Sequence, residues 1–169
     1  KLSTLDTLIG KSLAEGHKIL IFSQFVSMLN FIREYLDSSG LRYCYLDGSQ
    51  TVEKRAAQVQ AFQSDEDLIP IFLMSLKAGG YGLTLTKADT VIHFDPWWNP
   101  AVEAQATDRA HRIGQTRTVT SYKLIAGGSI EEKMLQLQAR KRYVADVALD
   151  DECPLMESLS NEDLEYILS

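Results

Sequence analysis

Short and almost uninterrupted apolar runs recur along this chain, and they constrain its fold more than any other feature. The clearest are KILIFS at 18–23, IPIFLMS at 69–75 and TVIHFD at 90–95. Each run has the length of a strand rather than of a helix, and none shows the polar alternation of a strand with one face in water. Such runs are typical of strands that are buried on both faces of a parallel sheet.

Segments with helical periodicity separate these runs. Apolar residues recur three or four positions apart over 1–15, 25–36 and 51–62, which predicts amphipathic helices. Two further strands are expected over 42–46 and 118–125. Because strands alternate with helices, we predict an α/β domain in which helices cover both faces of a parallel sheet.

A helix that begins at Pro100 is expected to carry a polar face. On such a helix Gln105, Arg109 and Arg112 are spaced i, i+4 and i+7, so they point the same way. The planar guanidinium of arginine matches phosphate oxygens, which suggests a phosphate-binding face, with Gly114 ending the helix. For an isolated R-x-x-R pair, however, a solvated surface with incidental ion pairs is the more common interpretation.

The string SLKAGGYGLTL at 75–85 is the second candidate for ligand binding. Gly79, Gly80 and Gly82 let the backbone approach a ligand and offer amide donors to phosphate, and Lys77 adds a positive charge beside them. The alternative is a tight loop that needs glycine for its geometry alone.

Polar residues follow several of the predicted strands. They lie at 23–24, 47–49, 75–82 and 95–99. Ligands of open parallel sheets bind at the carboxyl ends of strands, so these segments are expected to gather at one edge of the sheet. A helix over 129–145 is expected after the last strand, opened by the capping box Ser129-x-x-Glu132.

Several of these strings resemble one family. QATDRAHRIGQ at 105–115 is similar to motif VI of the SWI/SNF-like superfamily-two ATPases, which translocate on double-stranded DNA, and SLKAGGYGLTL resembles motif V. DPWWNP at 95–100 also matches the family pattern. The shorter strings SQF at 23–25 and LDGS at 46–49 resemble motif IV and its companion, with less specificity. The resemblance runs over about 18–143, in family order.

The resemblance implies a RecA-like fold with a helical C-terminal extension, and it assigns roles to individual residues. Arg109 and Arg112 would be catalytic arginine fingers. The nucleotide would be bound by Gly80, Gly82, Gln105 and Gln115. Double-stranded DNA would be bound by Ser23, Gln24, Asp47, Gly48, Ser49, Ser75, Lys77 and Trp98. Trp97 is expected to be a packing residue.

A motor of this family has two RecA-like lobes, and the first binds ATP through a G-x-x-x-x-G-K-[ST] loop. Gly10-Lys11-Ser12 lacks the earlier glycine of that pattern, and no D-E-x-H-like pair is present. We therefore expect the second lobe of a longer polypeptide, with ATP and Mg²⁺ held mainly by the N-terminal lobe and no hydrolysis by this chain alone. The alternatives are a non-catalytic DNA- or partner-binding module, or a lobe of an RNA helicase.

The net charge of −6 is unevenly distributed. Residues 146–169 contain eight acids and no lysine or arginine, which leaves 17 basic and 15 acidic residues in 1–145, a net charge of +2. We therefore divide the chain into a helicase C-terminal domain over 1–145 and an acidic tail over 146–169, with a short helix at 161–168. DNA binding must then depend on a local basic patch.

The remaining features set the expected environment. Cys44 and Cys153 are too few for a disulfide scaffold and form no zinc-type pair. No apolar run reaches the ~20 residues of a membrane helix, so we expect an intracellular protein without a membrane partner. The short tail and the lack of basic extensions favour a bacterial cytoplasm or nucleoid over a nucleus. His93 is expected in the core, and His111 is given a structural role.

Overall fold

The computed structural model describes residues 1–66, 68–147, 162 and 165–166. In this part of the chain, a five-stranded sheet has the order β2-β3-β1-β4-β5, and every neighbouring pair is parallel. The strands are β1 (Ile19–Ser23), β2 (Tyr43–Leu46), β3 (Ile71–Ser75), β4 (Thr90–His93) and β5 (Thr120–Lys123). The predicted parallel α/β sheet is confirmed.

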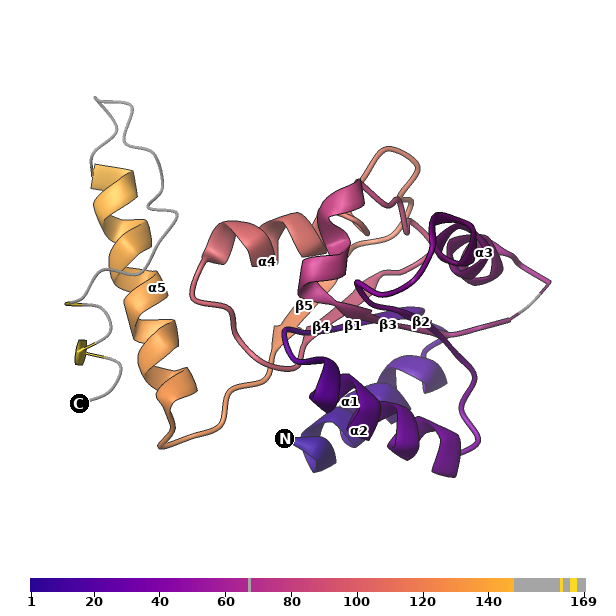
Figure 1. Cartoon of the computed structure of the whole chain (residues 1–169), viewed down its shortest axis with the longest axis horizontal. Helices are drawn as coiled ribbons and strands as arrows, with labels where there is room; N and C mark the ends of the chain where they lie inside the picture. Colours follow the sequence, from indigo (N-terminus) through magenta and orange to yellow (C-terminus); the bar gives the residue numbers. More distant parts are fainter. Residues whose placement is uncertain (67, 148–161, 163–164, 167–169) are drawn as a thin grey trace.

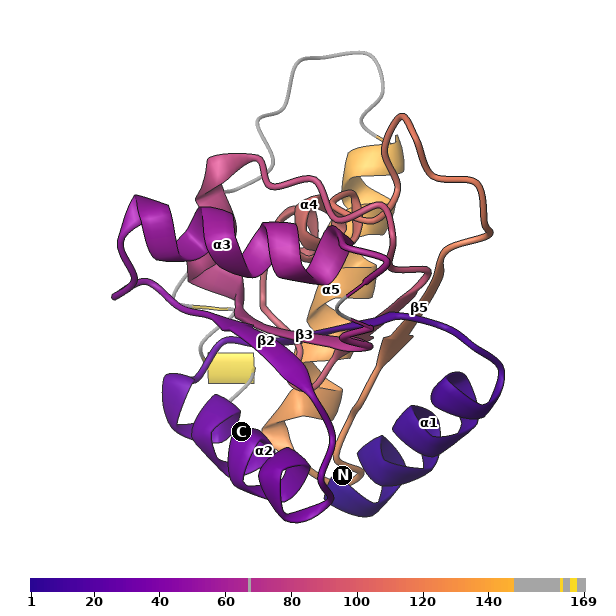
Figure 2. The same ribbon diagram turned by 90° about the vertical axis from the view of Figure 1, so that its right-hand side faces the viewer.

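Helices cover both faces of this sheet (Figure 1). They are α1 (Leu2–Ala14), α2 (Val26–Ser38), α3 (Val52–Gln63), the 3-10 helix η1 (Leu76–Tyr81), α4 (Pro100–Thr107) and α5 (Ile130–Val147). Helices α1 and α2 lie on one face, and α3, η1 and α4 lie on the other, as Figure 2 also shows for α1, α2 and α3. Helix α5 lies beside α4, at the side of the molecule remote from α3.

Strand β1 shows why the apolar runs are continuous. Ile19 and Ile21 pack in the core layer under α1 and α2, whereas Leu20 and Phe22 pack in the layer under α3 and α4. Successive side chains of a strand point to opposite faces, and all four residues are fully buried. Both faces therefore require apolar residues over 19–22, and the only polar residue of the strand is Ser23 at its carboxyl end.

The helix from Pro100 ends earlier than predicted. Helix α4 stops at Thr107, so Arg109 and Arg112 lie in the turn that follows it and not on a helical face with Gln105. The Thr107 hydroxyl donates to the carbonyl of Glu103, a bond that competes with regular helix geometry. The Arg109 carbonyl accepts a hydrogen bond from the backbone N–H of Leu85 at 2.9 Å. The Arg109 carbonyl therefore bonds to a distant residue of the chain and not to a residue of its own helix.

Two other helix faces differ from expectation. Apolar residues recur over 51–62, but Val52 is 77% exposed and Phe62 is the one buried residue of α3. Ile130 is likewise exposed at the start of α5, whereas Leu137 is buried. Both exposed residues lie in the first turn of a helix, before the helix reaches the core that its later turns cover.

The capping box of α5 is shifted by one residue. The Ser129 hydroxyl accepts from the N–H of Glu131, and the Glu132 carboxylate accepts from the N–H of Gly128 at 2.9 Å. The predicted helix at 161–168 and most of the acidic tail lie outside the described residues, as does the side chain of Val144. No helix in the described part is long and apolar enough to cross a membrane.

Candidate functional site

The carboxyl ends of β1 and β4 meet at Asp95. Chain connections leave these adjacent strands in opposite directions, which makes their carboxyl ends the ligand-binding crevice of an open parallel sheet. The Asp95 carboxylate accepts hydrogen bonds from the Ser23 hydroxyl and from the N–H of Gln24, and the Gln24 amide donates to the carbonyl of Pro96. Burial raises the pKa of Asp95 above its ordinary value, against the lowering effect of these donors.

Ser23 does not cap the helix that follows it, although it precedes α2 closely. Its side chain is fully buried and accepts from the N–H of Phe25 at 3.1 Å, and α2 begins only after Phe25. The hydroxyl is thus bonded to Asp95 and the backbone. Gln24 is half-buried and Phe25 is exposed, so both residues of this turn remain accessible to a ligand.

The turn after β2 is held by Asp47. One carboxylate oxygen accepts from both the N–H and the hydroxyl of Ser49, at 2.9 and 2.6 Å, and the other accepts from the Tyr45 hydroxyl at 2.7 Å. Burial alone would raise the pKa of Asp47, but the donors from Ser49 and Tyr45 hold it below its ordinary value. Asp47 is therefore an ionised turn-former, and the exposed residues are Gly48 and Ser49.

The glycine-rich segment is helical rather than a loop. Helix η1 follows directly from the buried Ser75 at the end of β3 and includes Gly80. Gly82 ends it with a left-handed φ of 59°, a conformation that glycine adopts without strain. Lys77 on η1 is exposed, and its Nζ lies 5.9 Å from the centroid of the Trp97 ring.

Arg112 joins the glycine-rich segment to the turn after α4. Its Nη1 donates to the carbonyl of Gly82 at 2.8 Å and lies 3.4 Å from the Thr84 hydroxyl. The side chain is otherwise exposed. The two segments with the strongest sequence signals therefore meet in space, although about 30 residues separate them in the chain.

Arg109 lies close to Arg112 but in a different environment. It is only 3% exposed. Burial lowers the pKa of its guanidinium, and the charge of Arg112 lowers it further. Its Nε and Nη1 are buried without a hydrogen-bond partner in the described part of the chain. Buried donors without partners are rare in folded proteins, so Arg109 differs in this respect from the exposed Arg112.

The two predicted glutamines differ from each other. Gln105 is exposed on α4. The Gln115 amide nitrogen donates to the carbonyls of Ala88 and Ala110, and its oxygen accepts from the N–H of Arg117. This geometry suits Gln115 to positioning the segment that carries the arginines.

Sequence reasoning missed three polar residues around the tryptophan loop. Glu103 is buried, accepts from the N–H of Trp97 and pairs with Lys123. Gln138 on α5 is buried and donates to the Trp97 carbonyl. Trp97 packs on the core as predicted, and Trp98 is half-buried beside it. The one feature of the sequence that could have indicated Glu103 is its place as an acid in the first turn of α4, but the partners of Glu103 are set by tertiary structure.

His93 lies in the core as predicted, whereas the structural role expected of His111 stays a prediction. His93 is buried, stacks on Phe22, and its Nε2 lies 3.1 Å from the Thr107 hydroxyl. Burial lowers the pKa of His93 to about 4, against the raising effect of the Glu103 charge. His111 is exposed. Among the residues that the structure describes, no group of three or more acidic, histidine or cysteine side chains could hold a metal ion.

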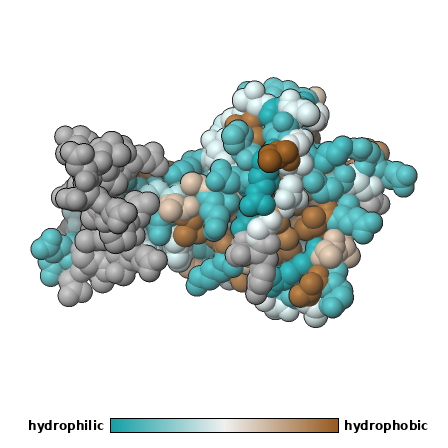
Figure 3. Space-filling model, turned by 90° about the horizontal axis from the view of Figure 1, so that it is seen from above, coloured by the Kyte–Doolittle hydropathy of each residue, from teal (hydrophilic) through white to brown (hydrophobic). Residues whose placement is uncertain are grey.

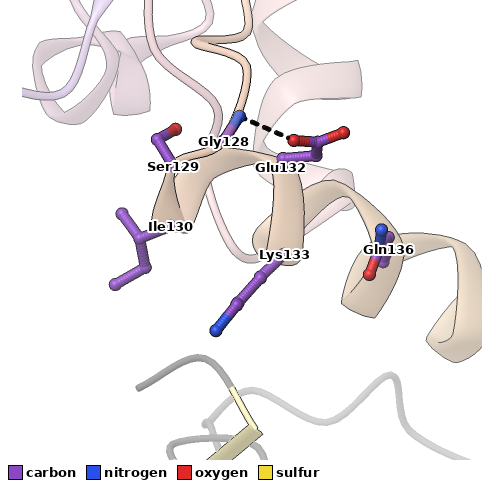
Figure 4. Close-up of a pocket in the computed structure, with 6 residues that line it drawn as sticks. All are labelled: Gly128, Ser129, Ile130, Glu132, Lys133 and Gln136. Atoms are coloured by element: carbon purple, nitrogen blue, oxygen red, sulfur yellow. Dashed lines mark hydrogen bonds between the residues drawn. The ribbon is translucent and has the colours of Figure 1, made fainter. Parts of the chain in front are cut away.

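A cavity of about 470 Å³ lies at the start of α5 (Figure 4). Glu132 and Ser129 occupy the helix N-terminus there, because they bond to the N–H groups of Gly128 and Glu131. Helix α4 lies between α5 and η1 (Figure 1), so this cavity is separate from the arginine site.

The face that α3 and α4 cover is largely hydrophilic, with only small hydrophobic areas (Figure 3).

Comparisons with known proteins agree on one family. The helicase conserved C-terminal domain family matches residues 1–114. The chromatin-remodeling ATPase INO80 of Drosophila melanogaster is 48% identical over 85% of this chain, and an uncharacterized ATP-dependent helicase of Mycoplasma pneumoniae is 41% identical over 93%. INO80 of Cryptococcus neoformans is 44% identical over 88%. The chain spans only 9%, 15% and 8% of these relatives, respectively.

A solved structure gives the same result. The crystal structure of the C-terminal part of the Fun30 ATPase domain has a TM-score of 0.80 and 34% identity to this chain, and the match covers 98% of this chain and 50% of that one.

The prediction of a bacterial cytoplasm or nucleoid is wrong. Relatives from fungi and a fly are chromatin-remodeling ATPases, which points to a nucleus. The prediction depended on the ends of this chain, and the chain spans too little of its relatives for its ends to indicate the cellular compartment.

Proposed function

This chain belongs to the helicase conserved C-terminal domain family, in its SWI/SNF-like branch, and from this membership we propose that it is the second motor lobe of an ATP-dependent double-stranded DNA translocase. Its partners would be DNA, within chromatin, and an N-terminal RecA-like lobe of the same polypeptide. The short span of the chain on its relatives, 8% of INO80 from Cryptococcus neoformans, is consistent with one lobe of a larger motor.

The observation that carries this proposal is the buried guanidinium of Arg109, whose Nε and Nη1 have no hydrogen-bond partner among the described residues. A buried charge without a partner is destabilising, and the guanidinium fork fits phosphate oxygens. A terminal phosphate that the N-terminal lobe presents would supply the missing acceptors for Nε and Nη1. ATP and Mg²⁺, when bound by that lobe, would supply the phosphoryl group and the charge neutralisation for hydrolysis.

Arg112 would act as the second finger. It is already fixed to the Gly82 carbonyl, so a movement of the glycine-rich segment would move this guanidinium too. Lys77 lies in η1, and this helix ends immediately before Gly82. The segment that would contact DNA and the residue that would contact nucleotide are therefore linked through one short stretch of backbone.

The accessible residues at the carboxyl edge of the sheet would hold the DNA. They are Gln24, Gly48, Ser49, Lys77 and Trp98. Amides, hydroxyls and lysine contact the phosphate backbone and position a duplex without reading its sequence. Ser23 and Asp47 would support these contacts from behind, since both are buried and bonded within their own turns.

The test is Arg112→Ala in this chain joined to its N-terminal lobe, with the exposed Arg42→Ala as a control of equal charge. We expect DNA-stimulated ATP hydrolysis to fall by about 10³-fold or more, the size of an arginine-finger contribution, while DNA affinity stays the same. Equal losses of hydrolysis and DNA affinity would contradict the finger role. Full hydrolysis by the variant would likewise show that Arg112 is not an arginine finger.

A further inference from the structure

Four residues from four segments form a closed set of contacts around the tryptophan loop. The N–H of Trp97 donates to the carboxylate of Glu103 at 2.7 Å, and Glu103 forms an ion pair with Lys123. The ammonium of Lys123 also donates to the amide oxygen of Gln138 at 3.4 Å. The amide nitrogen of Gln138 donates to the carbonyl of Trp97, which closes the set. We call these residues the tryptophan-loop clamp. They join the loop after β4 to α4, to the end of β5 and to the middle of α5.

The burial of the clamp is unusual for its residue types. Glu103 is 2% exposed and Gln138 is 3% exposed, although glutamate and glutamine are mostly surface residues. A buried polar group is destabilising unless it is hydrogen-bonded. The packing of α5 could have been achieved with an apolar side chain at this position, as it is at the neighbouring Leu137. The amide of Gln138 therefore has a more specific use.

That use is to fix the backbone next to Trp98. Glu103 holds the N–H of Trp97, and Gln138 holds its carbonyl, which belongs to the peptide unit that joins Trp97 to Trp98. The orientation of this peptide unit determines where the half-buried Trp98 points. The Trp97 ring in turn lies 5.9 Å from the Nζ of Lys77. Two of the side chains proposed to contact DNA, Trp98 and Lys77, thus lie next to the same loop.

We propose that Glu103, Lys123 and Gln138 are positioning residues that make the DNA-binding geometry of Trp98 and Lys77 depend on the docking of α5. With α5 docked, the clamp holds the tryptophan loop in its DNA-binding orientation. With α5 displaced, the loop loses its carbonyl contact, and DNA binding weakens. Helix α5 lies after the last residue of the family match, Gly114. This inference rests on the proposed function.

The first test uses this chain joined to its N-terminal lobe. Gln138→Met removes both amide contacts at similar length and helix propensity, and Gln136→Met is the matched control, because Gln136 is exposed on the same helix and has one bond, from Tyr166. We expect only Gln138→Met to raise the DNA concentration for half-maximal ATPase stimulation, by about five- to tenfold, as for one or two lost hydrogen bonds. The rate at saturating DNA should stay within about twofold of wild type.

The opposite pattern would overturn the inference. A merely structural Gln138 would lower the rate at saturating DNA, because less protein is folded, and would leave the half-saturating concentration unchanged. Equal behaviour of the two variants would overturn it too. If wild type shows no DNA-stimulated hydrolysis, the proposed function fails, but the clamp can still be tested by a second measurement.

The second test is tryptophan fluorescence of this chain, whose two tryptophans are Trp97 and Trp98. Indole emission shifts to longer wavelength when water reaches the ring. We expect this red shift in Gln138→Met and not in Gln136→Met, with the same far-ultraviolet circular dichroism for both. An unchanged emission in folded Gln138→Met would show that the amide does not hold the loop.

Discussion

Glu103 and Arg109 are two charged residues that lie six positions apart and are equally buried, at 2% and 3% exposure. Glu103 accepts from the N–H of Trp97 and pairs with Lys123. Within the residues that the structure describes, Arg109 leaves Nε and Nη1 without partners. A buried charge is tolerated when it is paired, so Glu103 has the partners that its burial requires, whereas Arg109 would obtain them only under the proposed function, from a bound phosphate.

The difference follows from where the two residues lie. Glu103 occupies the first turn of α4, where the helix dipole favours an acid. Arg109 lies two residues beyond the end of α4, in a turn whose backbone is fixed by the contact with Leu85. The helix therefore contains the paired charge, and the turn contains the charge that we propose for the phosphate.

Of the substitutions that test the difference between Arg109 and Glu103, Arg109→Leu should have the largest effect on activity. In the joined protein we expect ATP hydrolysis to fall by about 10³-fold or more. The free energy of unfolding of this chain, measured in urea, should stay constant or rise by about 1 kcal/mol, because the substitution removes an unpaired buried charge. A loss of several kcal/mol would mean that Arg109 is structural, and the comparison with Glu103 would no longer hold.

Glu103→Leu should give the reverse result. It leaves the ammonium of Lys123 and the N–H of Trp97 without their acceptor, so we expect a loss of about 2–4 kcal/mol in the free energy of unfolding. The exposed Glu34→Leu serves as the control and should change stability by about 0.5 kcal/mol or less. Similar small effects of both substitutions would contradict the structural role of Glu103.

The pH dependence of His93 sharpens the comparison, since this residue is close to Glu103. Its pKa is about 4 in the folded protein because of burial, against about 6.5 in an unfolded chain. The folded-state pKa is the lower one, so protonation favours unfolding as pH falls from about 6.5 toward 4, at up to about 1.4 kcal/mol per pH unit. Above this range His93 makes no pH-dependent contribution.

We therefore expect His93→Phe to lose stability less steeply than wild type between pH 6.5 and 4 in urea melts. The exposed His111→Phe should follow the wild-type curve. Parallel curves for wild type and His93→Phe would show that His93 is not buried in its neutral form.

The sequence predicted the fold well because the relevant signal is local. Continuous apolar runs such as 18–23 can only be strands that are covered on both faces, and the similarity to the C-terminal part of the Fun30 ATPase domain confirms the RecA-like lobe. The predicted end of α4 was wrong, because the hydrogen bond between the backbones of Arg109 and Leu85 is a tertiary contact that the local sequence does not indicate. Gln138 was missed for the same reason, since nothing near it in sequence indicates a tryptophan carbonyl as its partner.

The roles of the individual residues are less predictable than their positions. The sequence singled out Arg112 and the glycine-rich segment separately, and the structure adds that the two are in contact and that Arg109 is the buried member of the arginine pair. Nucleotide and DNA contacts stay predictions, as does the division of the chain at residue 145.

Lys77→Ala should have the smallest effect. Removing one exposed phosphate contact should weaken DNA binding by about 0.5–1 kcal/mol at every DNA sequence and reduce the slope of the salt dependence by about 1. Titrations against several duplexes at several salt concentrations would measure both quantities, with the exposed Lys11→Ala as control. A loss that depends on the DNA sequence would contradict a backbone contact.

The central claim is that this lobe holds an incomplete phosphate site that a second lobe completes. The most direct test is ATP hydrolysis by the isolated chain and by the chain joined to its N-terminal lobe, each with and without double-stranded DNA. We predict turnover by the joined form alone, stimulated by DNA. If the isolated chain binds DNA tightly and joining the lobes adds no hydrolysis, the motor assignment is wrong and a binding module takes its place.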